Sequence, residues 1–223
     1  MHQQKGKKVL NYFFLLLLVG SINNISLNNI KFKKFENIKI KGLGTNSNAA
    51  LLQEIKKINL KNIFKLNKKE IDKKISSNTL VEKYNIFKIY PSSLDINIEK
   101  TRFLARINNK GKIFLLGSNG KLSKNDFLNN QLPFIFGRPD IDEFLKFKDI
   151  IDSSKISYDE IKSLYFFSSK RWDLELKNNK LIRLSKDYTK ESLKLVLEFL
   201  YNDEFKDMKV IDARIKNQII LND

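Results

Sequence analysis

A run of apolar residues directly behind a basic N-terminus restricts this 223-residue chain more than any other feature of its sequence. The run extends from Val9 to Leu27, and its main polar interruptions are Asn11, Asn23 and Asn24. The residues before it contain no acid and three basic side chains, those of Lys5, Lys7 and Lys8. A helix rises about 1.5 Å per residue and a bilayer core is about 30 Å thick, so about 20 largely apolar residues are needed to cross it. The run reaches that length only if its asparagines are included.

Such a run fits either a membrane anchor or a secretory signal peptide, because its strictly apolar core is shorter than a full span. Val19-Gly20-Ser21 is a poor match to a small-residue cleavage site, which favours an uncleaved anchor. A buried core helix is a third interpretation, but the basic start and the terminal position oppose it. We therefore predict a cytoplasmic tail at residues 1–8, a transmembrane helix at 9–28 and a linker at 29–34.

Basic residues also follow the predicted helix, at Lys31, Lys33 and Lys34. The positive-inside rule therefore gives only a small preference, which is for a cytoplasmic N-terminus. On this basis we expect a single-pass, type II membrane protein whose remaining residues lie outside the cytoplasm. The absence of cysteine is compatible with that location.

The chain lacks the side chains on which most catalytic and metal sites depend. It has no cysteine, and its single histidine is His2, beside the initiator methionine. A Ser-His-Asp triad, a thiolate nucleophile and a histidine or cysteine zinc site each lack a member. The sequence also offers no evident pair of carboxylates for glycoside hydrolysis. We predict a protein that is not an enzyme and that uses no cofactor, metal or small-molecule substrate.

The formal charge of +17 raises the possibility of a nucleic-acid partner. Only six of the 42 basic residues are arginine, the preferred residue for base and phosphate contacts, and the lysines are spread along the chain rather than gathered in one block. We interpret the charge as compositional drift and expect no nucleic acid among the partners. A basic, membrane-tethered nucleic-acid-binding protein remains the alternative, and a steep salt dependence of duplex DNA binding would distinguish it.

Residues 35–100 have the pattern of a small α+β domain of order β-α-α-β-β. Residues 35–42 alternate apolar and polar side chains up to Gly42, which predicts a strand. A helix is predicted at 48–58, with Ser47 or Asn48 as its cap, and a second helix behind a capping-box pattern at 67–70. Strands at 81–90 and 94–99 complete the unit.

Residues 101–223 are richer in strands and predict a mixed β-domain with flanking helices. A hairpin turn at 108–111 separates two strands, at 104–107 and 112–116, and a second turn follows at 118–120. Helices are predicted at 140–151 and 189–201, with a shorter one near Tyr158. The remaining predicted strands lie at 163–168, 172–177, 181–184, 208–214 and 218–221. The fold class is therefore α+β.

Several short motifs occur behind the predicted anchor in a fixed order. They are Ile38-Lys39-Ile40-Lys41-Gly42, Asn62-Ile63-Phe64, Tyr90-Pro91 with the strand Leu94-Asp95-Ile96-Asn97-Ile98-Glu99-Lys100, Leu104-Ala105, Leu132-Pro133 with Gly137, Arg171-Trp172-Asp173-Leu174, and Ile211-Asp212-Ala213-Arg214. In this order they resemble the bacterial cell-division family FtsQ, called DivIB in Gram-positive bacteria. Phe103 stands where that family usually has proline, and Gly117 where it often has an acid.

The resemblance implies a POTRA domain at 35–100 and an FtsQ-type β-domain at 101–223, in a single-pass inner-membrane protein at the division septum. It implies a scaffold that does no chemistry. The partners implied are FtsB-like and FtsL-like division proteins, with the POTRA domain associated with recruitment to the septum.

The resemblance also implies that a partner strand pairs with the last strand of the β-domain. The candidate binding residues on that strand are Ile215, Lys216, Asn217, Gln218, Ile219, Ile220 and Leu221. An unpaired edge offers a row of backbone donors and acceptors to any chain that can extend beside it.

Three further features have a structural and a functional interpretation. Lys170 and Arg171 are candidates for contact with an acidic partner segment, and a solvated basic pair is the competing interpretation. Trp172 is expected in the core. Asp212 and Arg214 share a strand face and could form a site, but a fold-supporting ion pair or a capping role is expected.

Overall fold

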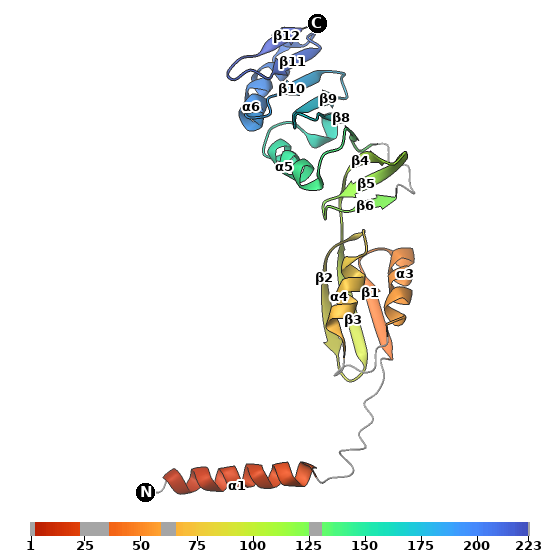
Figure 1. The fold of residues 1–223 in the computed structure, drawn as a ribbon, viewed down its shortest axis with the longest axis vertical. Helices are drawn as coiled ribbons and strands as arrows, with labels where there is room; N and C mark the ends of the chain where they lie inside the picture. Colours follow the sequence, from red (N-terminus) through yellow and green to blue (C-terminus); the bar gives the residue numbers. More distant parts are fainter. Residues whose placement is uncertain (1–2, 23–35, 59–65, 125–130, 223) are drawn as a thin grey trace.

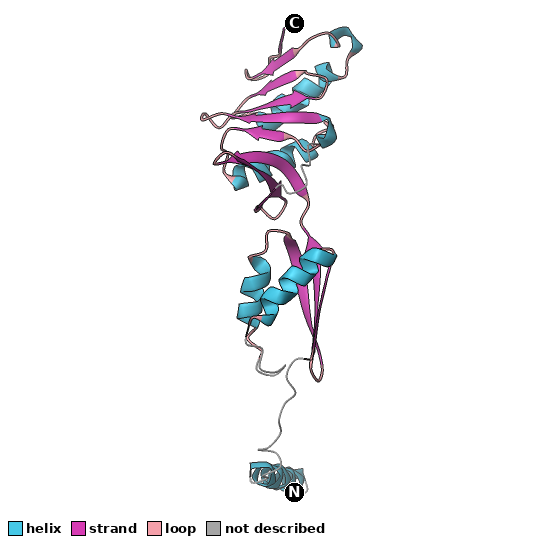
Figure 2. Ribbon diagram, turned by 90° about the vertical axis from the view of Figure 1, so that its right-hand side faces the viewer, coloured by secondary structure: helices cyan, strands magenta, loops and turns pink. Residues whose placement is uncertain are grey.

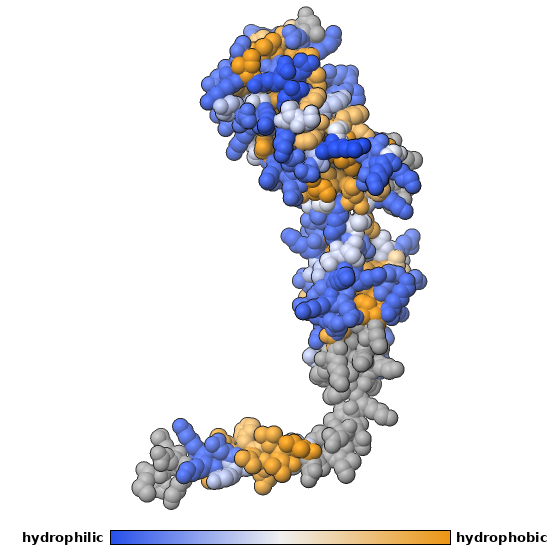
Figure 3. All heavy atoms as spheres, in the orientation of Figure 1, coloured by the Kyte–Doolittle hydropathy of each residue, from blue (hydrophilic) through white to orange (hydrophobic). Residues whose placement is uncertain are grey.

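The computed structural model describes residues 3–22, 36–58, 66–124 and 131–222 (Figure 1). Helix α1 (Gln3–Ile22) covers residues 9–22 of the predicted anchor, while residues 23–28 and the predicted linker lie outside the described residues. Figure 3 shows the hydrophilic start of α1 giving way to an apolar band. Within the four described ranges, no helix combines the length and hydropathy that a bilayer crossing requires.

The first globular part, the small unit, contains β1 (Asn37–Lys41), α3 (Thr45–Lys56), α4 (Lys68–Ser76), β2 (Val81–Ile89) and β3 (Ser93–Lys100). This is the predicted β-α-α-β-β order. Strand β3 is central, with β1 parallel on one side and β2 antiparallel on the other. Figure 2 shows both helices on one face of this sheet.

The core of the small unit follows from the period of two along β3 and the helical spacing of isoleucines. Leu94, Ile96 and Ile98 are buried beneath the helices, whereas the residues between them face away. Ile71 and Ile75 of α4 are fully buried, as their spacing predicts.

The predicted helix caps are wrong in detail. Helix α3 begins three residues early, with Gly44 as its N-cap at φ 90°, and Asn48 instead accepts a hydrogen bond from the backbone N–H of Leu43. Asn67 is the N-cap of α4, but its side chain donates to Glu70 Oε1 at 2.6 Å rather than accepting from the helix backbone. The pattern located the start of α4 but not that of α3, and it did not determine which groups bond at either start.

The second part, the large unit, is built on a sheet of nine strands in the order β12-β11-β10-β9-β8-β7-β4-β5-β6. Its elements are β4 (Phe103–Asn109), β5 (Lys112–Gly117), β6 (Leu122–Lys124), β7 (Phe134–Phe136), α5 (Ile141–Asp152), a 3-10 turn at Tyr158–Glu160, β8 (Ile161–Phe166), β9 (Trp172–Leu176), β10 (Leu181–Leu184), α6 (Thr189–Leu200), a 3-10 turn at Asp203–Phe205, β11 (Val210–Ala213) and β12 (Ile220–Asn222). Apart from the final strand, the predicted helices and strands of this region are confirmed to within a few residues.

One face of the large sheet carries the core. A row of side chains in register crosses β8 to β12 and packs with α5 and α6: Leu164, Leu174, Ile182, Ile211 and Leu221. Trp172 is 6% exposed, and its ring stacks on Phe147 of α5 with centroids 4.5 Å apart. The expectation that Trp172 belongs to the core is therefore confirmed.

Strand β7 is one of the elements that the sequence did not predict, because three residues are too short to show a period. It lies inside the Leu132-Pro133…Gly137 motif, and it joins β4 to β8 in parallel. Gly137 ends it at φ 96°, where an added Cβ would lie 2.2 Å from the carbonyl oxygen of Phe166. The glycine is thus required by close backbone approach.

The two units are joined by side-chain hydrogen bonds around the turn after β5. Asn119 Nδ2 donates to the carbonyl oxygens of Thr79 and Val81, both at 2.9 Å. Glu82 Oε2 accepts from Thr101 Oγ1 at 2.8 Å and from Ser118 Oγ at 2.7 Å. Side chains of the large unit thus donate hydrogen bonds to backbone carbonyls and to a carboxylate of the small unit. These bonds fix the two units against each other.

Replacing Gly137 with alanine should destabilise the large unit by at least about 1–3 kcal/mol, because the residue would be strained in φ and would also collide with backbone. Gly111→Ala is the matched control: Gly111 also has a positive φ, 81°, but no atom lies within 4 Å of its added Cβ. Chemical denaturation should show the larger loss for Gly137→Ala. Equal losses would contradict the close approach.

Candidate functional site

Strand β12 is the outermost strand at one end of the large sheet. It pairs antiparallel with β11, and in the register Val210 lies opposite Asn222, Ile211 opposite Leu221 and Asp212 opposite Ile220. No strand pairs with its other side among the residues that the structure describes. The last strand therefore has an open edge in this chain (Figure 1).

The bounds of the predicted final strand are wrong. Only Ile220 and Leu221 of the seven candidate residues lie in β12, which runs to Asn222. Ile215, Lys216, Asn217, Gln218 and Ile219 form the connection from β11, with Asn217 at φ 57° and the backbone N–H of Gln218 donating to the carbonyl of Ile215. The chain needs these residues to reverse direction, since β12 returns antiparallel to β11.

Side chains of this C-terminal hairpin divide between core and solvent. Ile219 and Leu221 are half-buried and pack against the core, whereas Ile220 is 41% exposed and Ile215 is 53% exposed. The hairpin is thus fixed to the fold by alternate residues. Ile220 and Ile215 remain available for contact.

The face of the large sheet opposite the helices carries a second row in register, which we call the open-face row. Its members, in order from β8 to β12, are Tyr165, Asp173, Arg183, Asp212 and Ile220. The charges alternate in sign across β9, β10 and β11. The row leads directly to the open edge.

Each acid of the open-face row is bonded to an arginine two residues away in the sequence, just outside the end of the strand that carries the acid. Arg214 donates from Nε to Asp212 Oδ1 at 2.8 Å and from a terminal nitrogen to Oδ2 at 2.6 Å. Arg171 makes the same kind of fork with Asp173, at 3.1 and 3.3 Å. The predicted pairing of Asp212 with Arg214 is confirmed. In both forks the guanidinium group is bonded to a carboxylate of the same chain, whereas a phosphate-binding surface would leave such a group exposed.

The pKa values of Asp173 and Asp212 are shifted in opposite directions. Burial raises the pKa of Asp173 above its ordinary value, although the hydrogen bonds and charge of Arg171 counteract it. Burial would also raise the pKa of Asp212, but the hydrogen bonds from Arg214 and the nearby charge of Arg183 outweigh it and hold this pKa below its usual range. Asp212 is therefore the better stabilised carboxylate.

Lys170 and Arg171 lie at the turn between β8 and β9, so β10 and β11 separate them from β12. Lys170 Nζ is 2.9 Å from Glu143 Oε1 of α5, which raises the pKa of Lys170 and lowers that of Glu143. Lys170 and Arg171 thus each have a carboxylate partner within the chain, and Lys170 keeps 64% of its side chain exposed. Only Arg171 also faces the open side of the sheet.

A groove of about 570 Å³ runs over the open face. The side chains that line it are Tyr165, Phe167, Arg171, Asp173, Glu175, Asn179, Leu181, Arg183 and Arg214. Arg183 and Asp173 were missed as site residues. The available signal was a charged residue at an alternate position of an otherwise apolar strand, as in Leu181-Ile182-Arg183-Leu184.

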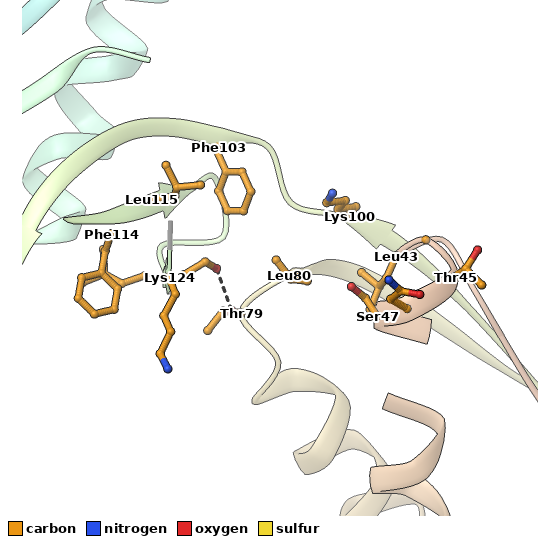
Figure 4. A pocket seen from close by; sticks show the side chains of 14 residues that line it. Leu43, Thr45, Ser47, Thr79, Leu80, Lys100, Phe103, Phe114, Leu115 and Lys124 are labelled. Atoms are coloured by element: carbon orange, nitrogen blue, oxygen red, sulfur yellow. Dashed lines mark hydrogen bonds between the residues drawn. The ribbon is translucent and has the colours of Figure 1, made fainter. Parts of the chain in front are cut away.

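A larger concavity of about 980 Å³ lies where the two units meet (Figure 4). Phe103, Phe114 and Leu115 line it from the large unit, and Leu43 and Thr45 from the small one. None of the described residues lining it is an acid, and the hydroxyls of Ser123 and Thr79 bond each other at 2.8 Å. Within the described ranges, no group of three or more His, Cys, Asp or Glu residues is arranged to hold a metal.

A family model for the POTRA domain of the FtsQ type matches residues 33–100, the small unit described above. Residues 33–100 of this chain are therefore a POTRA domain of the FtsQ type. The resemblance carried by Ile38-Lys39-Ile40-Lys41-Gly42 and by the strand ending at Lys100 is therefore confirmed, and the small unit is its POTRA domain. The α+β architecture of the chain agrees with the predicted fold class.

Solved structures similar to this chain include the major extracytoplasmic domain of the trans isomer of the cell-division protein DivIB from Geobacillus stearothermophilus. That match has a TM-score of 0.32 and 13% sequence identity, and covers 42% of this chain and 86% of the other. No curated protein shows significant sequence similarity to the chain.

We predict that Asp212→Asn costs about 1–3 kcal/mol of folding free energy at neutral pH, because a charge-assisted fork is lost beneath Arg214. The pKa of Asp212 is lowered on folding, so its stabilisation is complete above the unfolded-state value of about 3.9 and disappears as the pH falls through the folded value. The difference between wild type and variant should therefore shrink in acid when unfolding is measured by urea titration.

Asp173→Asn is the control, because the pKa of Asp173 is raised on folding. Its wild-type carboxyl gains stability as the pH falls from the folded value to the unfolded one, so the cost of this variant should grow in acid. A cost for Asp212→Asn that stays constant between neutral and strongly acid pH would refute the assignment.

Proposed function

We propose that this FtsQ/DivIB protein is a non-catalytic scaffold of the bacterial division machinery that binds partner proteins at the open edge of its large sheet. The observation that carries the proposal is β12, an edge strand with an exposed Ile220 and an arginine-lined groove beside it. Its FtsQ-type POTRA domain supports a role in cell division.

An extended segment of a partner would add a tenth strand beside β12. Its backbone would satisfy the outward donors and acceptors of Ile220 to Asn222, and this supplies affinity with little dependence on sequence. Specificity would come from side chains that reach Ile220 and the open-face row. Arg214 and Arg183 keep 45% and 36% of their side chains exposed beyond their bonds to Asp212, so an acidic partner residue is favoured at that point.

The partners we propose are FtsB-like and FtsL-like division proteins, by the family resemblance. The candidate contact residues are those of the C-terminal hairpin from Ile215 to Leu221, joined by Arg171 across the groove. Lys170 is a weaker candidate, since Glu143 holds its side chain against α5.

We further propose that residues 9–28 anchor the protein once in the inner membrane at the septum, with the POTRA and β-domains in the periplasm. The support is the apolar band of α1, the lysines ahead of it and the continuation of the apolar run to Leu27 in the sequence.

Proline scanning of β12 should separate binding from folding. Successive N–H groups of an antiparallel strand point alternately to the two sides, so Ile220→Pro and Leu221→Pro each remove a donor from a different side. The variant that removes the donor facing β11 should be less stable than the wild type. The other should keep the wild-type melting temperature and bind an FtsB-like partner at least about tenfold more weakly, or about 1.4 kcal/mol.

Ile220→Val and Leu221→Met are the controls, because they keep the backbone donor and a similar side chain. Both should bind as the wild type does in titration calorimetry. If the stable proline variant also binds with unchanged affinity, strand addition at β12 is wrong, while membership of the family is unaffected.

A further inference from the structure

The turn between β2 and β3 displays apolar side chains that the POTRA domain does not use in its core. Phe87 is 51% exposed, Ile89 50% and Tyr90 62%. Outside α1, no other four-residue stretch of the described chain carries even two large apolar side chains this exposed. We call residues 87–90 the hairpin tip. Such a concentration marks a contact surface.

The hairpin tip lies at the end of the POTRA domain where the chain enters from the N-terminal helix. Ser93 is in register with both Ile89 of β2 and Asn37 of β1. The backbone N–H of Glu36 donates to the carbonyl of Ser92 at 3.0 Å, and the hydroxyl of Ser92 donates to the carboxylate of Glu36. The large unit is attached at the opposite end, after Lys100 (Figure 1).

The distance from the hairpin tip to a membrane is limited by the length of the chain. Eight residue-to-residue steps lead from the predicted end of the anchor, at residue 28, to Glu36. Fully extended, they span at most about 26–29 Å, and a less extended chain brings the tip closer. Three lysines in this stretch, Lys31, Lys33 and Lys34, are attracted to anionic headgroups.

The composition of the hairpin tip suits a lipid–water interface. Aromatic rings with a polar end, such as that of Tyr90, are favoured at the headgroup level. Phe87 and Ile89 alternate with Lys88 along β2, so two apolar side chains share one face while a long basic side chain can extend toward phosphates. Contact with a protein partner would not explain why these side chains lie at the end of the POTRA domain nearest the anchor.

We propose that the hairpin tip inserts into the headgroup region of the bilayer next to the anchor and so holds the POTRA domain against the membrane surface. This inference rests on the proposed membrane anchor. It assigns Phe87, Ile89 and Tyr90 to lipid contact, and it directs the large sheet with its open edge away from the membrane.

The absence of cysteine allows a direct test with single spin labels on the full chain. Three variants are needed: Lys88→Cys at the hairpin tip, Phe14→Cys in α1, and Lys112→Cys, an exposed lysine at the start of β5 in the large unit. Each protein is reconstituted into phosphatidylethanolamine–phosphatidylglycerol vesicles. Collision with oxygen and with a water-soluble nickel chelate then reports the depth of each label.

The label at residue 14 should lie in the hydrocarbon, and the label at 88 should be several-fold less accessible to nickel than the label at 112. Replacing Phe87, Ile89 and Tyr90 together with serine should make residue 88 as accessible as residue 112 without moving residue 14. The exposure of these three side chains makes the triple variant compatible with folding.

Each other outcome overturns a specific claim. Equal nickel accessibility at 88 and 112, with residue 14 in the bilayer, overturns the hairpin contact and leaves the anchor. Shielding of residue 88 that survives the triple serine variant, or that depends on the protein-to-lipid ratio, assigns the shielding to a contact other than these side chains with lipid and overturns the inference. A label at residue 14 in water overturns the proposed anchor, and the hairpin contact with it.

Discussion

Backbone hydrogen bonding across the large sheet is the interaction on which the proposed binding edge at β12 depends. Among the residues that the structure describes, every strand from β6 to β11 but the first is paired on both sides, and β12 pairs with β11 alone. Only three register pairs hold β12, and Leu221 is its one residue that packs against the core. The fold thus orders β12, but among the described residues it provides no strand to pair with the outer side of β12. A partner strand would complete the pairing at little cost in ordering the protein.

The charged row on the open face explains why this edge and this face stay uncovered. On the helix side, the aliphatic row from Leu164 to Leu221 is buried by α5 and α6. On the other side, Asp173, Arg183 and Asp212 alternate at corresponding positions, with Arg171 and Arg214 forked onto the acids. Burying these ion pairs under a further helix would cost more desolvation than it returns. The same arginines keep enough exposed surface to meet acidic side chains.

Much of the fold was predictable because its elements are long enough to show a period. The alternation in Leu94-Asp95-Ile96-Asn97-Ile98 and the helical spacing of Leu193, Val196 and Leu200 each predict an element that the structure confirms. Short elements were not predictable. Strand β7 has three residues, and the turn before β12 took up five of the residues assigned to the last strand. Sequence alone also cannot show that Asp173, Arg183 and Asp212 meet, because the contact depends on a parallel pairing of β10 with β11 across the intervening helix α6.

Hydrogen exchange of the β12 amides, measured by NMR on the free protein and on its complex with an FtsB-like partner, tests the central claim most directly. In the free protein, the β12 amides that point away from β11 should exchange nearly as fast as an unstructured peptide, while those of Ile211 and Asp212 are protected. In the complex, the outward amides of β12 should become protected. If they are already protected in the free protein, or if partner binding leaves their exchange unchanged, β12 is not the open edge at which this protein binds.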